Sequence, residues 1–127
     1  MQNTKLSLVI LLVVLTFSFA WAKPNPFHTA VAADGGAPSA NVSSVAGRAP
    51  YFLFFDESGK FGSALKNPFL GTPGAGPKVA VLLNEKGVKV FMAASFGGNM
   101  ANFMATKGIT LKEFSGIAAD AAKNATK

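Results

Sequence analysis

The sequence contains no cysteine and a single histidine, His28. Without thiolates the chain cannot form disulfides, and it cannot hold zinc or an iron–sulfur cluster through cysteine. One histidine without a placed partner gives no Ser/His/Asp arrangement for nucleophilic catalysis. Carboxylates are also few, six in all, and only Asp34 is expected at the cleft described below, whereas a two-metal nuclease needs several that converge. These absences favour a binding protein over an enzyme.

Basic residues outnumber acidic residues by 12 to 6, which gives a formal net charge of +6. The lysines are scattered along the chain and form no basic block. Aromatic residues are not interleaved with basic clusters, as they are in proteins that bind single-stranded nucleic acid. We therefore expect a small anionic ligand, and not a nucleic acid, as the partner.

The N-terminus has the pattern of a secretory signal peptide. Lys5 supplies a positive charge, residues 6–19 are uncharged and mostly apolar, and Ala20-Trp21-Ala22 is an A-x-A cleavage site. The apolar run is shorter than the about 20 residues that a membrane span needs, and an uncleaved N-terminal anchor is the alternative. We predict a signal peptide over residues 1–22 and a single domain over residues 23–127. The protein would be secreted, in the periplasm, with no membrane contact after signal cleavage.

Hydrophobic patterning predicts an α/β domain. Strands are expected over residues 28–33, 51–55, 60–66, 88–94 and 109–114. Residues 56–59 form the turn of a hairpin, residues 60–66 its edge strand, and residues 37–46 a loop. Helices are expected from about Pro77 to Lys86, from after Asn99 to about Lys107, and from Ser115 or Gly116 to near the C-terminus, with Gly87 and Gly108 as caps of the first two. A hairpin followed by crossover units predicts a five-stranded mixed sheet with helices on both faces.

Residues 71–78, with the sequence GTPGAGPK, are the most distinctive stretch of the chain. Gly74 and Gly76 allow close approach of the backbone, and Pro77 suits the first turn of a helix. Free N–H groups at a helix start favour an anion, and Lys78 adds a positive charge. Pro77 stands where a phosphate-binding Walker loop needs lysine, so that motif is excluded.

Two further glycine-rich turns follow predicted parallel strands, at residues 34–36 and 95–98. Ligands of open α/β sheets bind at the carboxyl ends of such strands, so we expect these turns and the loop before Pro77 to converge on one crevice. The candidate cofactor-binding residues are Asp34, Gly35, Arg48, Gly74, Gly76, Lys78, Ser95, Phe96, Gly97 and Gly98.

These candidates, and three other possible metal ligands, also have purely structural interpretations. The glycines could form tight turns, and Arg48 could form a salt bridge with Asp34 or Asp56 instead of binding a polyanion. His28 could be a metal ligand or a surface residue. Met100 and Met104 could ligate Cu(I) or pack in the core.

Four segments resemble the dinitrogenase iron–molybdenum cofactor-binding family: AVAADGG at 30–36, GRAPYF at 47–52, GAGPK at 74–78 and SFG at 95–97. The resemblance covers nearly all of residues 29–125. It implies a ribonuclease H-like fold and noncovalent binding of an iron–molybdenum or molybdenum–copper sulfide cluster in the crevice. We therefore predict an exported carrier of a small anionic metal–sulfide cluster or thiometallate. The alternative is an interaction or accessory module of the cell envelope that keeps the fold without a cluster.

Overall fold

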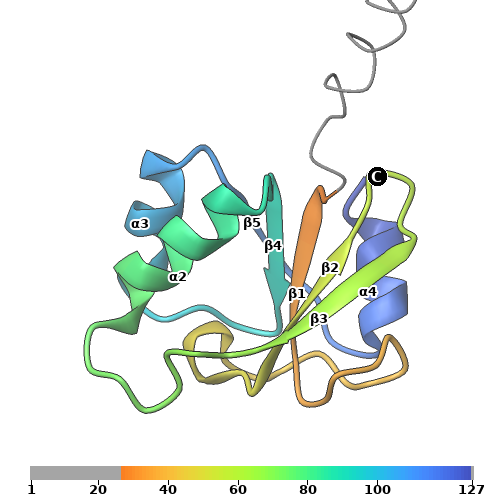
Figure 1. Ribbon diagram of the computed structural model, residues 1–127, viewed down its shortest axis with the longest axis horizontal. Helices are drawn as coiled ribbons and strands as arrows, with labels where there is room; N and C mark the ends of the chain where they lie inside the picture. The colour runs from red at the N-terminus through yellow and green to blue at the C-terminus, as the bar shows by residue number, and fades with distance from the viewer. Residues whose placement is uncertain (1–26, 127) are drawn as a thin grey trace, which may run out of the picture.

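The computed structural model of the protein describes residues 27–126 (Figure 1). The predicted signal peptide therefore lies outside the described residues. In chain order the elements are β1 (Thr29–Ala33), the short 3-10 helix η1 (Ala46–Arg48), β2 (Tyr51–Phe55), β3 (Phe61–Lys66), α2 (Ala75–Glu85), β4 (Val90–Ala93), α3 (Met100–Thr106), β5 (Thr110–Glu113) and α4 (Ala118–Asn124). The predicted order of strands and α-helices is confirmed.

The five strands form one mixed sheet in the order β3-β2-β1-β4-β5. β2 pairs antiparallel with β1 and β3, and β4 pairs parallel with β1 and β5. The hairpin and the edge position of residues 61–66 are thus as predicted. The parallel strands β1, β4 and β5 all point the same way, so the sheet has a carboxyl end and an amino end. The turn of the β2–β3 hairpin lies at the amino end, because Phe55 pairs with Thr29.

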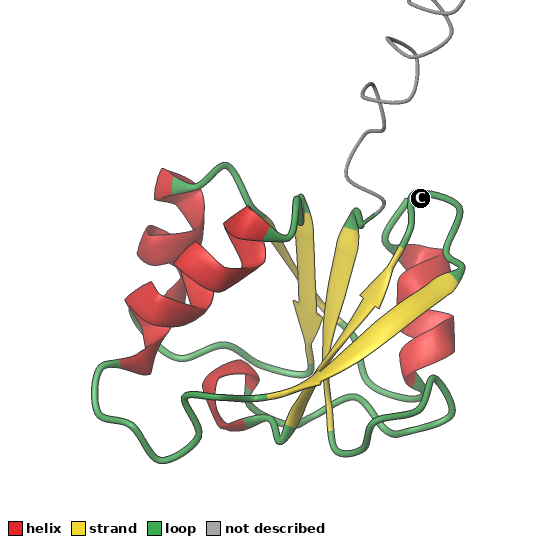
Figure 2. Ribbon diagram, viewed as in Figure 1, coloured by secondary structure: helices red, strands yellow, loops and turns green. Residues whose placement is uncertain are grey.

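Helices cover both faces of the sheet (Figure 2). Side chains alternate along β1: Ala30 and Ala32 pack with α2 and α3, and Val31 and Ala33 pack with α4. We call these two sides the α2 face and the α4 face. Burial on both faces explains why residues 30–33 of β1 are all apolar.

Helices α2 and α3 both end where their glycines were predicted to cap them. Gly87 and Gly108 have φ of +82° and +69°, a conformation that glycine adopts without a steric penalty. The N–H groups of Gly87 and Val88 donate to the carbonyls of Asn84 and Leu83, both at 3.0 Å. This is a Schellman motif, and residues 104–109 repeat it at the end of α3.

Several element boundaries differ from the sequence prediction. α2 begins at Ala75, two residues before the predicted Pro77, because Gly74 takes the left-handed conformation and acts as its N-cap. α4 begins only at Ala118, since the N–H groups of its first two residues donate to the carbonyls of Ala40 and Pro38. Within residues 27–126 no helix is long and apolar enough to cross a membrane.

Candidate anion-binding site

The loop over residues 37–46 fills part of the crevice that was predicted between β1 and β4. Ser43 is buried. Its N–H donates to the carbonyl of Ala32 at 2.7 Å, and its carbonyl accepts from Ala94 at 3.0 Å. This residue therefore lies between the carboxyl ends of the two parallel strands, where their own pairing has stopped. The space left for a ligand at this end of the sheet therefore lies to either side of the loop, and not directly between β1 and β4.

The turn at residues 34–36 lies on the α4 face. Asp34 donates its N–H to the carbonyl of Asn41, Gly35 lies against Ala40, and Gly36 lies against the ring of Tyr51. Tyr51 packs with the cluster under α4. These contacts place Gly35 and Gly36 beside the cluster under α4. The side chain of Asp34 is exposed at the carboxyl end of β1.

The turn at residues 95–98 lies on the α2 face and is joined to the same loop. The hydroxyl of Ser95 donates to the carbonyl of Ser44 at 2.6 Å, and the carbonyl of Ser95 accepts from Ala46. Phe96 is half-buried and its ring lies 5.7 Å from that of Phe91, edge to face. Ser95 and Phe96 thus fix the turn. Gly97 and Gly98 are exposed, and a Cβ on either would meet nothing within 4 Å.

The first turn of α2 has no side-chain cap. Gly74 is the N-cap with φ of +68°, and within residues 27–126 no side-chain hydrogen bond caps this turn. The first N–H groups of a helix have no partner within the helix, and Pro77 has none to offer. The N–H groups of Ala75 and Gly76 are therefore the donors of this turn, with the exposed Lys78 one residue beyond Pro77. A groove of about 290 Å³ beside them is lined by Phe69, Pro77, Lys78 and Val81.

Gly76 has a packing role that the sequence did not reveal. A Cβ at this position would lie 2.8 Å from Cδ2 of Phe103, closer than carbon atoms can approach. The absence of a side chain thus lets α2 lie against α3. Glycine at this position is therefore needed for helix packing, whether or not its N–H also binds a ligand.

Arg48 lies close to this turn without an ion-pair partner in the described part of the chain. Asn67 is buried and joins the two segments, since its amide donates to the carbonyl of Ala49 and its side-chain oxygen accepts from Phe69, both at 2.9 Å. This fixes η1, which carries Arg48, beside the loop that leads into α2. The salt bridge to Asp34 or Asp56, the alternative considered for Arg48, is not formed. The exposed guanidinium of Arg48 and the ammonium of Lys78 are therefore two cations on the α2 face. Glu113, which ends β5, is the acidic residue on the same face.

The side chains present suit an anion better than a metal ion. Within residues 27–126 no three His, Asp or Glu side chains are grouped so that they could hold a metal. Met100 and Met104 are 6% and 0% exposed and belong to the core under α2 and α3, so packing accounts for them. A metal–sulfide cluster would have to be held by backbone N–H groups and cations, because the chain also has no cysteine.

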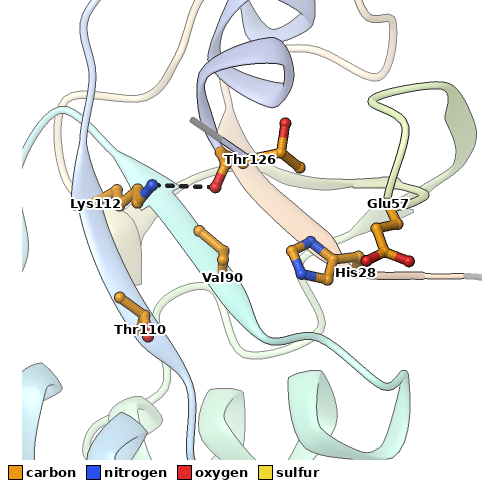
Figure 3. Close-up of a pocket in the computed structure, with 7 residues that line it drawn as sticks. His28, Glu57, Val90, Thr110, Lys112 and Thr126 are labelled. Carbon is orange, nitrogen blue, oxygen red and sulfur yellow. Dashed lines mark hydrogen bonds between the residues drawn. The ribbon is translucent and has the colours of Figure 1, made fainter.

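The amino end of the sheet has a cavity that the sequence did not predict. It measures about 570 Å³ and is lined by His28, Glu57, Val90, Thr110, Lys112, Ala125 and Thr126. Figure 3 shows Lys112 reaching from β5 to the end of α4, where its Nζ donates to the carbonyl of Ala125 at 3.0 Å. His28 directly precedes β1 here, and its Nδ1 lies 3.1 Å from Oγ1 of Thr29. The lining residues are far apart in sequence, so no local motif could have indicated this cavity.

Fold and site together define a small α/β protein whose turns at one end of a mixed sheet present backbone N–H groups and two cations. The chain belongs to the family described as dinitrogenase iron-molybdenum cofactor, whose model matches residues 28–127. The resemblance seen in the sequence is thereby confirmed.

Solved structures that are similar to this chain include the following two. One is the NMR structure of a putative NifB protein from Thermotoga, with 31% identity, a TM-score of 0.65, and coverage of 78% of this chain and 85% of that one. The other is the apo form of the orange protein from Desulfovibrio gigas, with 22% identity, a TM-score of 0.69, and coverage of 80% and 88%. The second likeness supports the fold alone. No curated protein sequence is significantly similar to this chain.

Proposed function

We propose that this protein is a carrier that binds a small anionic metal–sulfide cluster or thiometallate, of the iron–molybdenum or molybdenum–copper type, without covalent bonds. The family description names a cofactor and not a reaction, which supports a carrier over a catalyst. Neither the family nor the similar structures favour an accessory module without a cluster. The strand order also supports the ribonuclease H-like fold that the resemblance implied.

The observation that carries the proposal is the uncapped first turn of α2 beside η1. The N–H groups of Ala75 and Gly76 and the exposed N–H groups at Gly97 and Gly98 would surround the cluster. Arg48 and Lys78 would offset its negative charge. An anion at a helix start gains roughly 0.3–1 kcal/mol from the helix dipole, and more when it is partly buried. Gly35 is left out of this site because it packs against Ala40, which belongs to the cluster under α4, and Asp34 is left out because its carboxylate would repel an anion.

The proposal extends to the place of action. The pattern over residues 1–22 supports export, so the carrier would work in the periplasm. Cell fractionation with the intact chain, followed by mass measurement of the purified protein, tests this directly. Recovery from the periplasm with the mass of residues 23–127 is expected, and recovery of the uncleaved chain from the cytoplasm would contradict it.

Cluster binding is tested by uptake of tetrathiomolybdate, alone and with added copper. The purified protein should keep molybdenum through desalting and show the absorption of the bound thiometallate. The pair Arg48→Gln with Lys78→Gln should lower uptake about tenfold or more, because two cations leave the site. Lys89→Gln with Lys107→Gln removes the same charge at the amino end and should leave uptake unchanged. A protein that retains no molybdenum under either condition, or equal losses in the two pairs, would contradict the proposed site.

A further inference from the structure

The two edge strands of the sheet, β3 and β5, differ in how well they are protected against pairing with another chain (Figure 2). Short length and charged side chains are common means of protecting an edge. β5 has four residues and carries both Lys112 and Glu113. β3 has six residues and carries a single charge, Lys66, at its last position. The β3 edge therefore lacks the protection that the β5 edge has.

The backbone of β3 is accessible along most of its length. Gly62, Ser63, Ala64 and Lys66 are exposed, and the first three have small side chains or none. Apart from the ladder with β2, residues 61–66 make no backbone hydrogen bond with the rest of residues 27–126. The outer backbone groups of β3 are thus available to another strand.

The ladder between β2 and β3 determines which of these groups point outward. Asn67 directly follows β3, and its N–H donates to the carbonyl of Pro50 at 2.8 Å, so Asn67 faces β2. Residues of an antiparallel strand alternate between facing one neighbour and facing the other. Leu65 therefore also faces β2, whereas the N–H and C=O groups of Ala64 and Lys66 point outward.

We propose that β3 pairs antiparallel with β3 of a second copy of this chain, so that two five-stranded sheets become one continuous sheet. In this dimer Leu65 lies opposite Leu65 of the second copy, at the two-fold axis. Ala64 lies opposite Lys66 of the second copy, and the reverse pair is identical by symmetry. Every outward N–H and C=O of these two residues is then paired.

The registers displaced by two residues to either side are less favourable. One of them places Lys66 opposite Lys66, and like charges directly opposite each other destabilise a strand pair. The other places Lys66 opposite Gly62, which is the unpaired residue of the bulge in β3. A bulge disrupts the regular ladder, so this register loses hydrogen bonds.

The side chains of β3 suit a second copy of the same strand. Leu65 is half-buried and packs against the core on the α2 face, so the second copy would extend that apolar contact across the axis. Ala64 pairs with Leu53, whose side chain lies on the α4 face, and it is small enough to leave room for the long side chain of Lys66 opposite. This inference does not depend on cluster binding, because its test needs no metal.

The test is sedimentation equilibrium of the protein purified from cells that express the full chain. The average mass should rise from that of one chain toward that of two as the protein concentration approaches about 1 mM. Ala64→Lys places a like charge opposite Lys66 at both symmetric positions and should raise the dissociation constant about fivefold. Ala64→Glu places an opposite charge there and should lower the dissociation constant about fivefold.

The matched controls are Ala105→Lys and Ala105→Glu, which add the same charges at an exposed position of α3. They should change the dissociation constant less than about twofold, and thermal unfolding verifies that all four variants keep the fold. The mass of one chain at every concentration would overturn the proposal and leave the β3 edge to a strand of another protein. So would Ala64 variants that shift association in the same direction, or no more than the controls do.

Discussion

Glycine serves opposite purposes at the two ends of the sheet. At the amino end Gly87 and Gly108 close α2 and α3, and their left-handed conformations let neighbouring N–H groups pair with the last carbonyls of each helix. At the carboxyl end Gly74 opens α2 in the same conformation and leaves the first N–H groups of the helix without a cap. A glycine that completes backbone pairing is a structural device. One that leaves donors exposed creates a place where an anion can bind.

Gly76 shows that position near the site is not enough to assign a function. It lies two residues from Gly74, yet the space that a side chain would take is occupied by the ring of Phe103. Gly97 and Gly98 face open space instead. Substitution by alanine should therefore affect stability differently where glycine allows close packing, where it adopts the left-handed conformation, and where it is only exposed.

The largest effect on stability is expected for Gly76→Ala. The added Cβ would lie 2.8 Å from Phe103, and such overpacking costs about 1–3 kcal/mol, part of which is offset because alanine favours helix by about 1 kcal/mol. Urea unfolding should show a net loss of up to about 2 kcal/mol. In a Phe103→Ala background the same change should cost nothing. An identical loss in both backgrounds would show that the contact is not the cause.

A smaller loss is expected for Gly87→Ala at the amino end. Its φ of +82° costs a residue with a Cβ about 1 kcal/mol or somewhat more. The matched control is Gly98→Ala, where φ is not in the left-handed region and nothing lies within 4 Å, so its change in unfolding free energy should stay within about 0.5 kcal/mol. If Gly98→Ala were the more destabilising of the two, the distinction between a paired and an exposed glycine would fail.

The smallest effect concerns the hairpin turn at the amino end. The carboxylate of Asp56 accepts from the hydroxyl of Ser58 at 2.6 Å and from the N–H of Lys60 at 2.9 Å, and these bonds, the hydroxyl first, lower the pKa of Asp56 below its ordinary value. The stabilisation is therefore full above the ordinary pKa of about 3.9 and is lost as the pH falls through the lower pKa of the folded state.

Asp56→Asn should accordingly be slightly less stable than the wild type at neutral pH, and the difference should vanish in strong acid. Denaturant unfolding at several pH values below 5 measures it. A difference between the two proteins that stays constant with pH would mean that the charge of Asp56 contributes nothing to the turn.

The sheet was predictable because its signals are local. Apolar runs marked β1, β2 and β4, the turn at residues 56–59 fixed the hairpin, and Gly87 and Gly108 each followed a helical pattern directly. The start of α2 was placed two residues late because proline is typical of the first helical position, whereas Pro77 is the third residue of α2. The left-handed Gly74 that begins the helix is recognised only from its backbone conformation.

The site was predictable only in part, because its shape depends on contacts between distant residues. Ser43 enters between β1 and β4 through bonds to Ala32 and Ala94, and nothing in the sequence around it indicates this. The role of Asn67 in fixing η1 beside α2 was hidden for the same reason.

The central claim is that an anionic cluster binds at the carboxyl end on the α2 face, and backbone amide chemical shifts test it most directly. In a titration of the ¹⁵N-labelled protein with tetrathiomolybdate, the amide signals of Ala75, Gly76, Gly97 and Gly98 should move, with saturation at one common concentration. The signals of Gly87 and Gly108, whose N–H groups are already paired, should stay in place. Shifts confined to the amino end, or to the turn at residues 34–36, would contradict the account.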